Sequence, residues 1–155
     1  MNINLINLKM LKFNMNIIVI SLIVLFACSK EIKPIEYGKD QCEQCRMVLT
    51  DKKYGAEIIT KKGKALKFDA AECMLNYLKD KKIEGNDVDS YYVINLTEPG
   101  VLINAVNATY LISPELRSPM GEDISAFADR NMAEKYLNKY GGVIYSWDEL
   151  RNKFK

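Results

Sequence analysis

Residues 54–68, YGAEIITKKGKALKF, decide the fold. Two runs rich in apolar residues, Tyr54–Thr60 and Lys64–Phe68, flank the pair Lys62-Gly63. Glycine supplies the backbone freedom that a tight turn needs, and alternating apolar runs on either side of such a turn are typical of paired strands. The stretch therefore predicts a β-hairpin.

A helix and a further strand are expected directly after the hairpin. Asp69 is a residue type that caps helices, and Glu72 occupies the third position of a helix expected to extend through Lys82. Tyr91–Asn95 then has the β-branched and aromatic content of a strand, and Met47–Thr50 is a shorter strand candidate before the hairpin. The sequence up to this point predicts a β-β-α-β unit.

The same pattern of strands and a helix occurs a second time in the C-terminal half of the sequence. It contains three strand-like runs, a helix that begins at Asp129 or Asn131 and ends at Gly141-Gly142, and a final helical turn. The strand-like runs are Thr109–Ser113, Ile124–Phe127 and Val143–Trp147, and the final turn spans Asp148–Phe154.

The two occurrences of this pattern share a pair of aromatic residues at the same spacing. Phe68 precedes a helix that carries Tyr77, and Phe127 precedes a helix that carries Tyr136, with the same offset. We therefore expect an α+β fold of two related β-β-α-β units, with helices packed on antiparallel sheet. The predicted boundaries are 41–155 for the domain, and about 41–97 and 98–155 for its halves.

The N-terminal region has the layout of an exported lipoprotein. Two lysines precede the apolar run Ile17–Phe26, which is short for a membrane span and is soon followed by Cys28. This ending resembles a bacterial lipobox. It predicts a signal peptide over residues 1–27, lipid on Cys28 and a polar tether over residues 28–40. An uncleaved anchor, or an ordinary signal with a chance cysteine, is the alternative interpretation.

Composition excludes several classes of site. Acidic and basic residues nearly balance at a net charge of +2 and form no basic stripe, which argues against nucleic-acid binding. The chain has no histidine, so it lacks the commonest general base and the commonest nitrogen ligand of metals. Any metal site therefore relies on sulfur, carboxylate or backbone donors.

The sequence CEQCRM, which begins at Cys42, is the leading site candidate. The spacing of Cys42 and Cys45 suits a structural disulfide, a redox pair or a soft-metal site. If the chain is extended after Cys45, the sulfur of Met47 faces the same side. Met120 follows a proline and precedes a glycine in a predicted tight turn, and it is the second candidate thioether.

This donor set selects a soft ion. Thiolates and thioethers without imidazole suit copper(I) better than zinc. For Met120, a loop side chain that packs on the core is an equally good interpretation. Cys73 and Asp69 are second-rank candidates, because a helical cysteine is commonly buried in the core and Asp69 doubles as a helix cap.

These residues resemble the NosL family, which are accessory lipoproteins of nitrous oxide reductase. The resemblance covers most of the chain after the lipobox. It rests on the element Cys42–Cys45–Met47, on Phe68-Asp69 before a helix with Cys73, on the loop Ser118–Gly121, and on Phe127. The family usually has glycine between the second cysteine and the methionine, where this chain has Arg46.

The resemblance implies a fold, a cargo and a partner. The implied fold has two β-β-α-β units similar to those of organomercurial lyase. The implied ligands of copper(I) are Cys42, Cys45, Met47 and Met120. The implied function is that of a copper(I) metallochaperone, not an enzyme, which is anchored to the membrane by lipid on the periplasmic or other extracytoplasmic side. Its implied partners are nitrous oxide reductase and the membrane transporter and maturation complex of that enzyme.

Other interpretations of the same residues stay open. A homodimer that shares one metal ion fits the number of donors. A thiol–disulfide oxidoreductase that uses Cys42 and Cys45 is the alternative function. A lyase for carbon–metal bonds and a non-catalytic lipoprotein, in which a disulfide only fixes the leader, are further candidates.

Overall fold

The computed structural model describes residues 32–80, 82–83 and 85–155. The predicted signal peptide over residues 1–27, the lipidation site Cys28 and the first part of the predicted tether lie outside these residues. No helix in the described ranges combines the length and the apolar character needed to cross a membrane.

The first sheet is built around β1 (Ala56–Thr60). This strand pairs antiparallel with β2 (Ala65–Phe68) and β3 (Val88–Ile94), and β4 (Leu102–Asn104) extends the sheet in the order β2-β1-β3-β4. The predicted hairpin is confirmed: Gly63 takes a φ of 78° in the turn between β1 and β2. β4 was not predicted.

The second sheet repeats this connectivity. β5 (Thr109–Ile112) lies between β6 (Ile124–Phe127) and β7 (Val143–Tyr145), and both pairings are antiparallel. In each unit the first strand pairs with the strand that follows it and with the strand beyond the helix. The predicted α+β fold with two β-β-α-β units is therefore confirmed.

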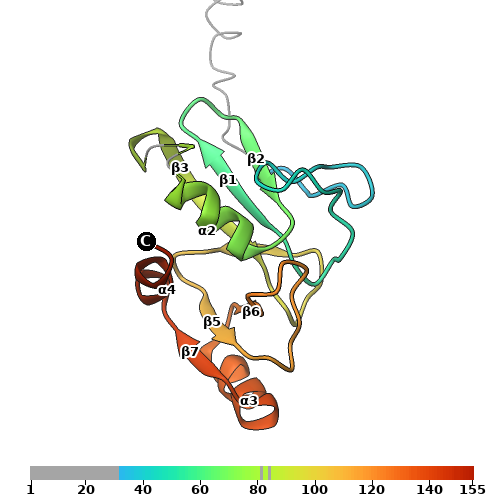
Figure 1. The fold of residues 1–155 in the computed structure, drawn as a ribbon, viewed down its shortest axis with the longest axis vertical. Coiled ribbons are helices and arrows are strands. Elements are labelled where there is room, and N and C mark those ends of the chain that lie inside the picture. Colours follow the sequence, from blue (N-terminus) through green and yellow to red (C-terminus); the bar gives the residue numbers. More distant parts are fainter. Residues whose placement is uncertain (1–31, 81, 84) are drawn as a thin grey trace, which may run out of the picture. The chain divides into compact units, whose positions relative to one another are not determined.

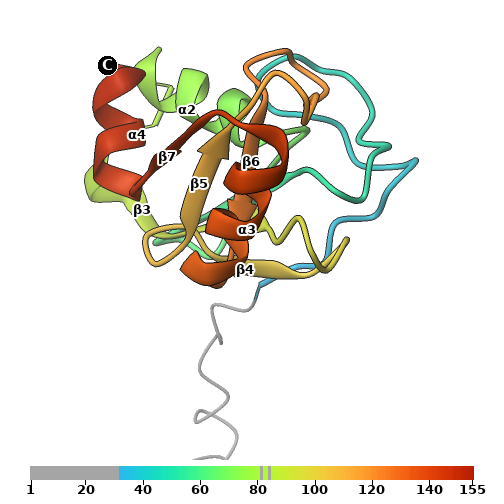
Figure 2. The same ribbon diagram turned by 90° about the horizontal axis from the view of Figure 1, so that it is seen from below.

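The helices cover the sheets. α2 (Ala71–Lys79) packs on β1 and β2, whereas α3 (Arg130–Tyr140) packs on the three strands of the second sheet. α4 (Trp147–Lys153) follows β7, and a short 3₁₀ helix, η1 (Gly85–Asp87), precedes β3. Figures 1 and 2 show α2 lying over the first sheet and α3 against the second.

One aromatic contact occurs in both units. The rings of Phe68 and Tyr77 lie 5.2 Å apart between their centroids, and those of Phe127 and Tyr136 lie 5.0 Å apart. In each case a phenylalanine at the end of a strand packs on a tyrosine of the following helix. The equal offset in the sequence thus corresponds to an equivalent contact in space, which supports the relationship between the two units.

The helix starts differ in how they are capped. The carboxylate of Asp129 accepts a hydrogen bond from the Asn131 N–H at 2.9 Å, as predicted for α3. The prediction that Asp69 caps α2 is wrong, because the cap residue is Ala70 and no side chain completes it. The predicted strand at Met47–Thr50 is reduced to a single bridge.

The folded domain begins earlier than its polar sequence suggested. Ile35 is buried in the core, and the Gly38 N–H donates to the Leu49 carbonyl at 2.8 Å. The Tyr37 hydroxyl donates to the Tyr54 carbonyl at 3.2 Å. Residues 35–40, which we expected to belong to the tether, therefore pack on the domain because they carry an isoleucine and a tyrosine that the core can bury.

Two further features hold the units together and restrict the backbone. The Leu96 N–H donates to the Ala126 carbonyl at 2.8 Å, which connects the end of β3 to β6.

Between α3 and β7, a Cβ on Gly142 would lie 2.2 Å from the Ile112 carbonyl oxygen, whereas one on Gly141 would meet open space. Only a glycine fits at the second of these two positions.

Candidate metal site

Three cysteines meet at one point of the fold. The sulfur atoms of Cys42, Cys45 and Cys73 all lie within 4.8 Å of one another, and all three thiols are free. Cys42 and Cys73 are 0% and 1% exposed, and Cys45 is half-buried. Cys73 is buried as expected for a packed cysteine, and its thiol also belongs to this thiol cluster.

A tight turn positions the first two thiols. The Cys42 N–H donates to the Met47 carbonyl at 2.8 Å, and the Arg46 N–H donates to the Cys42 carbonyl at 2.9 Å. The Glu43 N–H donates to the Lys67 carbonyl at 2.9 Å, which fixes the turn to β2. The segment is therefore not extended after Cys45, in contrast to the assumption that placed the Met47 sulfur beside the Cys45 sulfur.

The first turn of α2 supplies the third thiol, and several hydrogen-bond donors surround the Cys42 sulfur. The sulfur of Cys42 accepts hydrogen bonds from the thiol of Cys73 and from the backbone N–H groups of Gln44, Cys45 and Asp69. The Cys45 N–H lies 3.5 Å from this sulfur. Donors that converge on one sulfur stabilise its thiolate form.

The thiols accordingly differ in acidity. The hydrogen bond from Cys73, together with the backbone donors, lowers the pKa of Cys42 to about 5 against the opposing effect of burial. The pKa of Cys73 is raised, because its proton is held in the hydrogen bond to Cys42 and because it is buried. Burial also raises the pKa of Cys45. The metal-free cluster thus holds one thiolate and two thiols near neutral pH.

Asp69 adjoins the cluster through its backbone. Its side chain is 4% exposed, and its pKa is raised by burial and then by the charges of Cys42 and Asp51. Because its N–H is directed to the Cys42 sulfur, Asp69 precedes the helix rather than capping it.

The two candidate thioethers lie at the surface. Met47 is 52% exposed and Met120 is 37% exposed. Met47 adjoins the Cys42–Cys45 turn in the sequence, and Figures 1 and 2 both place the loop between β5 and β6, which carries Met120, beside the N-terminal end of α2. Cys42 and Cys73 are enclosed, Cys45 is half-buried, and the two methionines are exposed to solvent.

A buried contact fixes the Met120 loop to α2. The Ser118 hydroxyl donates to the carboxyl group of Glu72, the neighbour of Cys73. The Ser118 oxygen also accepts from the Asp123 N–H at 3.0 Å, and the Gly121 N–H closes the turn onto the Ser118 carbonyl at 3.2 Å. Glu72 is fully buried, and burial raises its pKa. The loop and the thiol cluster are thus attached to the same helical turn.

Comparisons with known proteins agree with this arrangement. A protein-family model described as NosL matches residues 34–154. The chain belongs to the NosL family. The copper-binding lipoprotein NosL of Stutzerimonas stutzeri is 26% identical over 129 residues, which cover 78% of this chain and 67% of that protein. The crystal structure of the copper chaperone NosL from Shewanella denitrificans matches with a TM-score of 0.68 and 25% identity, over 79% of this chain and 96% of that chain.

Arg46 stands at the position where the resemblance to the NosL family led us to expect a glycine. Its φ is 67°, which is the left-handed region that favours glycine. The turn therefore has the shape that a glycine would give, and the arginine adopts it at a conformational cost. Its guanidinium forms an exposed ion pair with Glu43 at 3.3 Å.

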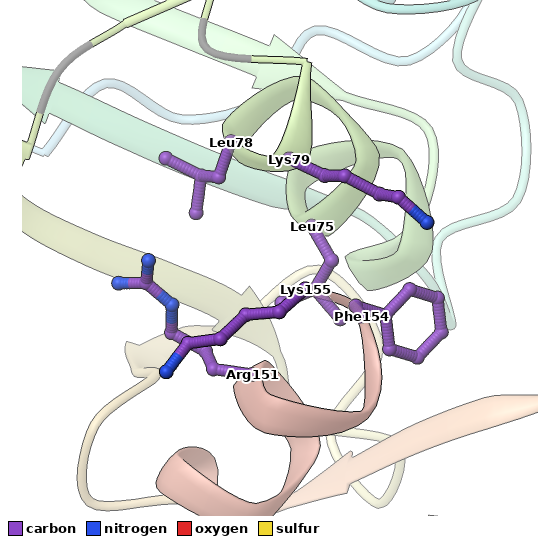
Figure 3. Close-up of a pocket in the computed structure, with 6 residues that line it drawn as sticks. All are labelled: Leu75, Leu78, Lys79, Arg151, Phe154 and Lys155. Atoms are coloured by element: carbon purple, nitrogen blue, oxygen red, sulfur yellow. The ribbon is translucent and has the colours of Figure 1, made fainter.

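One surface pocket is separate from the thiol cluster. Figure 3 shows the residues that line it, which come from α2 and from the C-terminal end of the chain: Leu75, Leu78, Lys79, Arg151, Phe154 and Lys155. Three cationic side chains border an apolar floor, and the lining contains no sulfur. Such a pocket does not suit a metal cation.

Sequence reasoning placed Cys73 in the second rank of candidates, and the structure brings its sulfur close to those of Cys42 and Cys45. Its position in a helix was predicted, but its distance from Cys42 depends on how the N-terminal segment returns across the start of α2. One feature of the sequence pointed to this proximity. Only a short connection joins β2 to α2, so Cys73, the third residue of the helix, lies near the end of β2. The Cys42–Cys45 turn is fixed to the same strand by the hydrogen bond between the Glu43 N–H and the Lys67 carbonyl.

Proposed function

We propose that this chain is an exported copper(I) metallochaperone that supplies the copper centres of nitrous oxide reductase. The observation that supports this most directly is the convergence of three free thiols within 4.8 Å in a chain without histidine. Thiolates are soft donors that favour copper(I) over harder ions. The names of the two relatives, one copper-binding and one a copper chaperone, point to the same cargo.

The proposed ligands fall into a thiol set and a thioether set. Cys42, Cys45 and Cys73 form the thiol set, in which the lowered pKa of Cys42 favours the negative charge that suits a monovalent cation. Met47 and Met120 form the exposed thioether set, whose members bind without losing a proton. The Asp69 carboxyl adjoins Cys42 and remains a second-rank ligand.

This division suits delivery rather than storage. Copper(I) accepts two or three sulfur ligands, so one donor can be exchanged for another without a fully dissociated ion. Cys45, Met47 and Met120 are each more exposed than Cys42 and Cys73, so we expect a partner to reach them before the buried thiols. We propose that transfer proceeds by replacement of these accessible ligands, with no catalytic turnover.

The proposed partners follow from the family. They are nitrous oxide reductase and its membrane transporter and maturation complex, which the lipid-anchored chain meets on the extracytoplasmic side of the membrane. Lipid on Cys28 supplies the anchor in this proposal. A homodimer that shares one ion through the accessible thioethers is compatible with the donor set.

Competition for copper(I) tests the proposal. The reduced full chain is titrated anaerobically with copper(I) against a chromophoric chelator. We expect the wild type to withdraw copper from the chelator, and a Cys45→Ser, Met120→Leu double variant to withdraw much less. Met132→Leu is the matched control, because Met132 packs on the core of the second unit and has no proposed role. Equal competition by the wild type and the double variant would contradict the proposal.

The geometry is less favourable to a thiol–disulfide oxidoreductase. Such an enzyme attacks its substrate with an accessible thiolate. Here the thiolate belongs to Cys42, which is fully buried, whereas the accessible thiol of Cys45 has a raised pKa. Reduction of insulin by the metal-free chain, with both cysteines required, would instead favour this second function.

A further inference from the structure

We infer that the thiol cluster is a substrate of thiol–disulfide exchange. Cys45 is the sulfur that reacts first, a Cys42–Cys45 disulfide is the oxidised form, and a dithiol reductase is the class of partner that restores the thiols. The consequence for metal loading rests on the proposed function, whereas the exchange chemistry does not.

Exposure decides which sulfur reacts first. Thiol–disulfide exchange proceeds through direct contact between an attacking sulfur and the sulfur it attacks, so access is required. Cys42 and Cys73 are 0% and 1% exposed, but Cys45 is half-buried on the outer side of the turn. A reagent or a partner protein can therefore reach one of the three cysteines without opening the fold.

The turn decides which sulfur reacts second. Cys42 and Cys45 belong to one closed turn, in which the Cys45 N–H lies 3.5 Å from the Cys42 sulfur, whereas Cys73 lies on α2. A mixed disulfide at Cys45 is thus attacked by Cys42.

The oxidation balances in two exchanges. The Cys45 thiol first gives its proton to solvent, and its sulfur then attacks a small disulfide, forms a mixed disulfide and releases one thiolate of the reagent. The Cys42 thiolate then attacks the Cys45 sulfur, forms the internal disulfide and releases the second reagent thiolate. The two cysteines lose two protons and two electrons in total, and the reagent disulfide takes up both electrons.

Reduction runs along the same path in reverse. A thiolate of a dithiol attacks the Cys45 sulfur and expels the Cys42 thiolate, which stays beside the Cys45 N–H. The second thiol of the reductant then displaces Cys45 and closes a disulfide within the reductant. Oxidation removes two of the three thiol ligands, and disulfides persist outside the cytoplasm. Reduction by the dithiol therefore precedes copper loading.

The arrangement of tryptic sites makes the test direct. Cleavage after Lys39 and Arg46 gives one peptide that contains both Cys42 and Cys45, whereas Cys73 falls in the separate peptide 68–79. A Cys42–Cys45 disulfide lowers the mass of the first peptide by two hydrogens. A disulfide to Cys73 cross-links two peptides.

The experiment uses the full chain, reduced, free of metal and kept anaerobic with a chelator. Brief alkylation of the native protein with limiting N-ethylmaleimide is expected to modify Cys45 about tenfold or more faster than Cys42 or Cys73, because reactivity follows exposure as well as thiolate character. Oxidation with glutathione disulfide is expected to give the two-hydrogen loss in peptide 40–46. Dithiothreitol is expected to reverse it faster than glutathione at equal thiol concentration.

Two variants separate the steps. Cys42→Ser is expected to accumulate a glutathione adduct on Cys45, because the resolving thiol is absent. Cys73→Ser is expected to form the Cys42–Cys45 disulfide still, because both reacting cysteines remain, and Met132→Leu, which has no proposed role, is the matched control. The wild-type peptide map keeps the test valid if either variant fails to fold.

Several results would overturn the inference. They are first alkylation at a buried cysteine, a cross-link to Cys73 as the main oxidised product, or no internal disulfide at all. A chain that exchanges as described but fails to bind copper(I) contradicts the proposed function alone. A chain that binds copper(I) but resists oxidation contradicts this inference alone.

Discussion

Replacement of Arg46 by glycine should stabilise the turn that carries the first two thiols. Arg46 has a φ of 67°, and a left-handed conformation costs a residue with a side chain roughly 1–2 kcal/mol. Glycine avoids this cost but loses about 0.5–1 kcal/mol through the greater freedom of its unfolded chain. The ion pair with Glu43 joins an arginine side chain that is 71% exposed, so its loss costs about 0.5 kcal/mol or less.

The sum predicts a small gain for glycine and a small loss for alanine. Arg46→Ala removes the same ion pair but keeps a Cβ in the left-handed region, so it is the matched control. We expect Arg46→Gly to exceed Arg46→Ala by about 0.5–1 kcal/mol in the free energy of unfolding, since the two variants differ only in that Cβ.

Urea unfolding of the reduced, metal-free chain measures this difference. Trp147 is the single tryptophan and is buried between Tyr91 and Tyr110, so its fluorescence reports on the core. The denaturant midpoint should shift without a change in the m-value, which indicates a change of stability alone. A glycine variant no more stable than the alanine variant would refute the assignment of strain to Arg46.

Three other substitutions test separate features. Burial raises the pKa of Glu57, so its protonated form stabilises the fold below the ordinary pKa of 4.5, and this contribution is lost as the pH rises through the raised pKa. In urea unfolding, the stability of Glu57→Gln relative to the wild type should therefore increase from pH 4.5 to pH 7.5. A difference in stability that does not change with pH would contradict the raised pKa. Gly142→Ala should destabilise the chain by roughly 3 kcal/mol or more, because a Cβ there meets a backbone carbonyl. Gly141→Ala is the matched control and should cost only about 1 kcal/mol. Equal urea midpoints for the two variants would refute the predicted difference in stability. Ser118→Ala leaves the buried carboxyl of Glu72 without its partner and should cost about 1–3 kcal/mol, with faster amide exchange in the Met120 loop as the specific readout.

Local chemistry explains which parts of the fold could be predicted. The β1–β2 hairpin depends on a glycine in a turn between two apolar runs, and the start of α3 depends on the Asp129 cap, so both are encoded within a few residues. The equal offset of Phe68–Tyr77 and Phe127–Tyr136 indicated the repeated unit. β4 has only three residues and exists because β3 offers it a pairing edge, which no local pattern shows.

The site was predicted in its chemistry more than in its geometry. A chain with cysteines and no histidine restricts a metal site to sulfur, carboxylate or backbone donors, and this inference needs no structure. The meeting of Cys73 with Cys42 depends on contacts between segments about 30 residues apart, which the spacing of neighbouring residues does not encode. The left-handed conformation of Arg46 could not be predicted either, because such a conformation is typical of glycine and not of arginine.

Copper K-edge X-ray absorption of the anaerobically loaded full chain tests the central claim most directly. The account predicts the edge shape of copper(I) and a first shell of sulfur only, with one sulfur fewer in the Cys73→Ser variant. A first shell dominated by nitrogen or oxygen, or an edge characteristic of copper(II), would contradict the claim that the thiol cluster holds the ion.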